Sequence, residues 1–94
     1  MVLTTKFFPI EQRNSRWVVD MPVGVGVIGV EFRAAGVLGL HALCDITAPM
    51  RPYELYVIDE GKEVPHDARH LGYFRWETRQ DVTHVFAKHF KLKL

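Results

Sequence analysis

The sequence predicts an all-β fold, either a small antiparallel β-sandwich or a partly closed barrel of about seven strands, with at most one short helical turn. Short apolar runs rich in β-branched residues recur at close spacing along the 94 residues. Turn-forming residues separate these runs, and no stretch has the apolar period of a long amphipathic helix. Many short strands without long helices are typical of sandwiches and small barrels.

A hairpin over residues 23–46 forms the predicted centre of the sheet. Two apolar runs flank Ala34-Ala35-Gly36, which matches a three-residue hairpin loop containing glycine. The first arm alternates apolar residues with glycine and charge, so one of its faces is expected to be buried. The second arm is apolar on both faces, so we expect it to lie centrally and to be covered on both sides. The expected inward positions are Ile28, Val30, Phe32, Leu38, Leu40, Ala42, Cys44 and Ile46.

Two strands are predicted before the hairpin. Residues 4–10 form the first, and Pro9 marks an edge or an exit because proline cannot donate to a ladder. Residues 16–21 form the second, with Trp17 placed against the core.

Three more strands are predicted after the hairpin, over residues 53–59, 71–78 and 82–90. The two prolines of residues 47–52 predict a stiff connection without regular structure. Residues 65–70 can form one helical turn, with Pro65 at its favoured first position. On the strand over residues 71–78, Phe74 and Trp76 are expected to fill the core while Tyr73 and Arg75 face the other way.

Length and charge limit the classes of function. The chain is long enough for one domain, residues 1–94, with a single core. Twelve Lys and Arg against 11 Asp and Glu give a net charge of +1, too small for general binding to nucleic acid or anionic membranes. The longest apolar run, residues 21–30, is interrupted by proline and glycine and is too short for a membrane helix. We therefore expect a cytosolic protein without membrane contact.

Candidate cofactor, metal and catalytic sites have simpler explanations. Residues 24–29 fit G-x-G-x-x-G, but the residues that follow are β-prone, whereas a dinucleotide site needs a helix there. His66 and His70 have the spacing of two metal ligands on one helical turn, with Asp67 or His84 as a third, yet a polar surface loop explains them as well. Cys44 is expected to be a small core residue. The sequence therefore predicts no catalytic residues, no cofactor and no metal site.

Short motifs recur in a characteristic order at residues 6–10, 21–22, 27–30, 36, 40–45, 48–49, 71–74 and 84–86. This order resembles a small family of bacteriophage and prophage proteins known only as a domain of unknown function. The residues that carry this resemblance are short and mostly apolar. Residues 59–62 depart from it, since family members often have a Thr-Gly-His turn there. The resemblance implies a phage origin and the host cytoplasm, but no established activity.

The sequence favours a non-enzymatic phage protein that binds a host enzyme or an antiviral-defence component. The alternative is a nucleic-acid-binding accessory factor that uses the basic residues Arg75, Arg79, Lys88, Lys91 and Lys93, because aromatic and basic residues interleave over residues 73–76. A small phage enzyme or a metal-binding protein is the third alternative. Residues 88–94 alternate apolar and basic side chains, so this tail either frays, reaches the partner or forms a homodimer. The predicted partner-binding residues are Tyr73, Arg75, Arg79, Lys88, Phe90 and Leu92.

Overall fold

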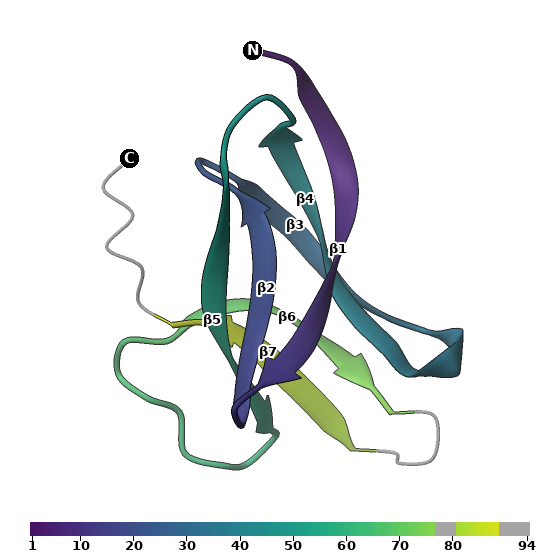
Figure 1. The fold of residues 1–94 in the computed structure, drawn as a ribbon. Helices are drawn as coiled ribbons and strands as arrows, with labels where there is room; N and C mark the ends of the chain where they lie inside the picture. Colours follow the sequence, from purple (N-terminus) through teal and green to yellow (C-terminus); the bar gives the residue numbers. More distant parts are fainter. Residues whose placement is uncertain (77–80, 89–94) are drawn as a thin grey trace.

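The computed structural model describes residues 1–76 and 81–88, and within them seven antiparallel strands form one nearly closed, barrel-like sheet (Figure 1). The all-β prediction is confirmed. The strand order is β3-β4-β1-β2-β5-β7-β6, and one 3-10 turn, η1 (Ala34–Gly36), lies between β3 and β4. The strands are β1 (Leu3–Arg13), β2 (Arg16–Pro22), β3 (Gly26–Arg33), β4 (Val37–Asp45), β5 (Met50–Asp59), β6 (Arg69–Arg75) and β7 (Val82–Ala87).

Two long strands, β1 and β5, connect the parts of the sheet. The first half of β1 pairs with β4 and its second half pairs with β2. Likewise β5 pairs first with β2 and then with β7. Pro9 lies where β1 changes partner, so its missing N–H interrupts no continuous ladder and the strand runs on to Arg13. The prediction that the strand ends at residue 10 was therefore wrong.

The inward side chains of all seven strands form one core. Leu40, Val19 and Val85 are completely buried. Phe32, Trp17 and Trp76 are only partly buried and pack against this core, so Phe32 and Trp76 are more exposed than predicted. The buried members of the core are Phe8, Ile10, Val19, Met21, Leu38, Leu40, Ala42, Cys44, Tyr53, Leu55, Phe74 and Val85.

The barrel closes where β3 meets β6, the two end strands of the sheet order. Phe32 of β3 lies against Phe74 and Trp76, with ring centroids 5.5 and 5.1 Å away. The Trp76 indole donates to the buried hydroxyl of Thr83 at 2.9 Å, and that hydroxyl donates to Asp59 at 2.7 Å. Aromatic packing and a buried polar network therefore hold this closure together.

The central hairpin forms as predicted, but its outward faces differ from the prediction. Ala35 and Gly36 adopt positive φ in the connecting turn. The register shifts between Val27 and Gly29, and Ile28 within this bulge is 61% exposed instead of buried. On the second face of β4, Leu43 is 44% and Val37 is 40% exposed, so this face is covered only in part.

Several predicted boundaries also differ. β5 begins at Met50, because residues 50–52 pair with β2 in spite of Pro52. Ile46 lies beyond the end of β4 and is 53% exposed. Residues 65–68 form a non-helical turn, closed by the Ala68 N–H bonding to the Pro65 carbonyl at 3.1 Å, and residues 69–70 already belong to β6. The predicted strand ends at residues 77–78 and 89–90 lie outside the described residues.

The glycines of residues 24–29 belong to a turn and a strand, not to a dinucleotide site. Gly24 lies in a turn with a φ of 77°, whereas Gly26 and Gly29 lie in β3, which continues as a strand to Arg33. Among residues 1–76 and 81–88, no helix is long and apolar enough to cross a membrane.

Candidate protein-binding surface

The outward side of β5, β7 and β6 carries a group of exposed and partly exposed aromatic and histidine side chains. On β7 the even-numbered residues are partly exposed and the odd-numbered ones are buried. Their cross-strand neighbours are also outward, so three strands contribute to one surface. We call this surface the β5–β7–β6 face; it consists of Glu54, Tyr56, Ile58, His70, Tyr73, Arg75, His84, Phe86 and Lys88.

A bulge in β6 places two of these side chains together. The register with β7 shifts between His70 and Gly72, so His70 pairs with Phe86 and Tyr73 pairs with His84. His70 and Tyr73 are three positions apart on β6, whereas their partners Phe86 and His84 are two positions apart on β7. The bulge therefore places His70 and Tyr73 on the same side of the sheet. Strict alternation would place His70 and Tyr73 on opposite faces.

These rings form a compact cluster. His70 lies 5.1 Å from His84 and 5.2 Å from Phe86 between ring centroids, and Tyr73 lies 6.0 Å from His84. The Nε2 atom of His70 is 2.9 Å from Nδ1 of His84, and Nε2 of His84 is 3.1 Å from Oε1 of Glu60. Tyr73 is 60% exposed, so the cluster presents a large aromatic side chain to solvent.

A hollow of about 260 Å³ opens beside this cluster. Its apolar wall consists of Ile58, Val64 and Phe86, and the two clustered histidines and residues 59–62 complete it. The loop that follows β5 frames the hollow, and Asp67 of this loop accepts a hydrogen bond from the Tyr56 hydroxyl at 3.1 Å. Desolvation raises the pKa of Tyr56, and the Asp67 hydrogen bond raises it further.

The far end of the β5–β7–β6 face carries an ion network centred on Glu54. Its carboxylate accepts hydrogen bonds from Nζ of Lys88 and from Nη1 of Arg16, each at 2.8 Å. The hydrogen bond from Lys88 is the main cause of the lowered pKa of Glu54, and the same contact raises the pKa of Lys88. The network joins β2, β5 and the residue after β7. Within it, the charge of Lys88 is paired with the carboxylate of Glu54.

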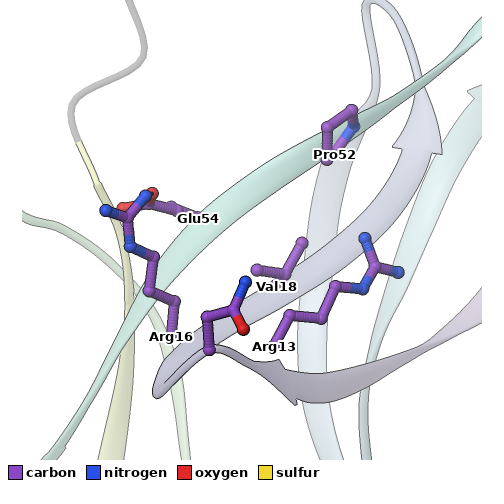
Figure 2. Close-up of a pocket in the computed structure, with 6 residues that line it drawn as sticks. Arg13, Arg16, Val18, Pro52 and Glu54 are labelled. Atoms are coloured by element: carbon purple, nitrogen blue, oxygen red, sulfur yellow. The ribbon is translucent and has the colours of Figure 1, made fainter.

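A second hollow, of about 490 Å³, lies over β2 and the start of β5 (Figure 2). Arg13 and Arg16 stand over Val18 and Pro52, with Arg16 pointing toward Glu54. Arg13 contacts Glu11 and Asp20, and Asp20 has its pKa lowered chiefly by the hydrogen bond from Arg13. Because carboxylates of the same chain already engage both guanidinium groups, this hollow is a poor candidate for anion binding.

The sequence predicted part of this surface. Tyr73 and Arg75 lie on its outward side as predicted, and Phe74 fills the core. Lys88 lies at the opposite end of β7, paired with Glu54. The predicted residues Arg79, Phe90 and Leu92 lie outside the described residues. His70, His84 and Phe86 were not predicted as partner-binding residues, although the two histidines were considered as metal ligands. Alternation along β7 could have identified His84 and Phe86, whereas the bulge that brings His70 to them leaves no simple sequence signal.

The structure separates His66 from the other histidines that the sequence considered as metal ligands, but it brings His70 and His84 into contact. His66 lies exposed in the turn before β6, and His70 lies on the strand beside His84. Within residues 1–76 and 81–88, no group of three or more His, Cys, Asp or Glu side chains is placed to hold a metal ion together. Cys44 is buried, as predicted.

Comparison with known proteins identifies a family of unknown function. No curated protein and no solved structure matches the chain. One family model matches residues 6–92, which is nearly the whole sequence. This match agrees with the resemblance to a domain of unknown function that the short motifs indicated. The chain therefore belongs to the family described as Domain of unknown function (DUF7352).

Proposed function

We propose that the chain is a non-enzymatic protein that binds another protein through the β5–β7–β6 face. The observation that carries this proposal is the exposed Tyr73 beside the His70, His84 and Phe86 cluster, next to an open hollow with an apolar wall. Aromatic residues and arginine are enriched at protein interfaces and dominate their binding energy. Tyr73 and Arg75 are both outward on β6.

The hollow gives this surface a way to select its partner. An apolar side chain of the partner can enter between Ile58, Val64 and Phe86, while His70 and His84 supply polar contacts at the rim. Interface anchors of this kind fill pockets and are surrounded by contacts that exclude water.

The partner that we propose is a host enzyme or an antiviral-defence component, met in the host cytoplasm by a phage-encoded protein. The resemblance of the short motifs to phage and prophage proteins supports this part. Binding to nucleic acid is less well supported, because Lys88 is engaged by Glu54 and the net charge is only +1.

An affinity capture from host cells with matched variants tests the proposal. Tyr73→Ala removes the exposed ring, and Leu43→Ala on β4 is the control, an exposed apolar side chain on another part of the sheet. We expect a protein that wild type and Leu43→Ala capture equally, with an affinity that Tyr73→Ala lowers about tenfold or more. Equal binding by all three proteins would contradict this surface. An affinity for nucleic acid that falls steeply as salt rises would favour the nucleic-acid alternative.

A further inference from the structure

We propose that His70 and His84 form a two-histidine site for a divalent transition-metal ion of the Zn²⁺, Ni²⁺ and Cu²⁺ group. Neutral imidazole nitrogens are the preferred protein ligands of these ions. The proposal goes beyond the proposed function and does not depend on it. It also differs from the sequence prediction of no metal site, which weighed His66 and His70 with Asp67 or His84 as a third ligand. The pair identified in the structure keeps His70 and His84, which come from two strands and are 14 positions apart, and leaves His66 out.

The distance between the two nitrogens fits one shared ion. His70 Nε2 and His84 Nδ1 are 2.9 Å apart. Two nitrogens that each lie about 2.05 Å from a metal are separated by about 2.9 Å at the angle of about 90° in a square-planar Cu²⁺ or Ni²⁺ site, and by about 3.3 Å at the tetrahedral angle of Zn²⁺. To bind one ion, both rings must rotate so that their lone pairs leave the N···N line and point at the metal, and for Zn²⁺ the nitrogens must also move apart by about 0.4 Å.

Glu60 sets the tautomer that this site needs. Its Oε1 atom lies 3.1 Å from Nε2 of His84, so the Nε2–H of His84 donates to Glu60 and Nδ1 keeps its lone pair toward His70. A carboxylate that holds the other ring nitrogen is the usual companion of a metal-binding histidine. On metal binding, neutral His70 shifts its proton from Nε2 to Nδ1, so the ring loses no proton overall.

The sheet orients the two ligands and leaves the rest of the coordination sphere open. Phe86 packs against the His70 ring and Tyr73 stands beside the His84 ring. The His84 side chain is 25% exposed and His70 is exposed, so the ion would face solvent. Since no third ligand comes from the described residues, water or a donor from a binding partner would complete the coordination.

Titration of the metal-free chain with Zn²⁺ alone, followed by calorimetry, tests the site. We expect saturable uptake that His70→Gln and His84→Gln each weaken by at least about tenfold and that Glu60→Ala weakens by about tenfold. His66→Gln is the matched control, because this exposed histidine is four positions from His70 but does not take part in the pair; it should bind Zn²⁺ as wild type does. Metal-free melting curves verify that each variant folds.

A second readout uses Cu²⁺ in place of Zn²⁺. The electron paramagnetic resonance spectrum of the bound ion should show coupling to imidazole nitrogens in wild type and lose part of that coupling in His84→Gln. No saturable binding, or an equal affinity for wild type, His70→Gln and His84→Gln, would overturn the site. Because no partner protein takes part, failure of this experiment is distinct from failure of the proposed protein binding.

Discussion

Gly72 of β6 packs directly against Val30 of β3. A Cβ atom added to Gly72 would lie 2.8 Å from Cγ2 of Val30, 3.2 Å from its Cβ and 3.4 Å from its backbone nitrogen. These two strands are the ends of the sheet order, and no ladder pairing joins them among the described residues. Because Gly72 has no side chain, the Val30 side chain can pack directly on β6, and the barrel closes there without a hydrogen-bonded ladder.

We expect Gly72→Ala to destabilise the protein by about 1–3 kcal/mol, because the added methyl group overlaps the short, branched side chain of Val30 and the two strands must shift to make room. Urea unfolding measures the change. Gly29→Ala is the control, since a Cβ there meets nothing within 4 Å, and it should change stability by less than about 0.5 kcal/mol. In a Val30→Ala background the cost of Gly72→Ala should shrink. An unchanged cost in that background would contradict the contact.

Leu40 is completely buried at the centre of β4, whereas Leu43 on the same strand is 44% exposed. Leu40→Ala should lower the free energy of unfolding by about 2–5 kcal/mol, through lost burial and the cavity left behind. Leu43→Ala should cost much less, because its side chain is already largely in water. Similar losses for the two variants, measured by urea unfolding, would show that the inward face of β4 is wrongly assigned.

Thr83 joins Trp76 to Asp59 through one buried hydroxyl. Thr83→Val keeps the shape but removes both hydrogen bonds, so we expect a loss of about 1–3 kcal/mol. Thr83→Ser keeps the hydroxyl and is the control for the polar part of the effect. Thermal unfolding gives the stabilities, and the emission of Trp76 should change in Thr83→Val. A Thr83→Ser variant less stable than Thr83→Val would indicate that the methyl group matters more than the hydroxyl.

The lowered pKa of Glu54 predicts how the free energy of unfolding changes in acid. The hydrogen bond from Lys88 lowers its pKa below the ordinary value of 4.5, so its contribution is present above that value and is lost as the pH falls through the pKa of the folded state. Glu54→Gln should therefore destabilise the protein near neutral pH, and its difference from wild type should narrow in acid. Urea unfolding across the pH range measures this. Glu63→Gln, an exposed glutamate of the loop after β5, is the control. A difference that stays constant with pH would contradict the ion network.

The elements of the fold follow closely from the local pattern of the sequence. Apolar alternation and turn residues predicted the strands, the central hairpin and the inward placement of Leu40, Ala42, Cys44 and Phe74. Strand boundaries were less accurate, because Pro9 and Pro52 interrupt the local pattern but occupy positions at which the ladder tolerates them.

The candidate surface depended on register, which the local pattern does not carry. Tyr73 and Arg75 were identified from their interleaving with inward aromatic residues, but His70, His84 and Glu60 come from separate segments. The pairing of β5 with β7 brings Glu60 to His84, and the bulge in β6 brings His70 to them. A bulge moves every following side chain by one position relative to the neighbouring strand. Alternation along one strand shows which side chains face outward; which of them become neighbours depends on how the strands pair across the sheet.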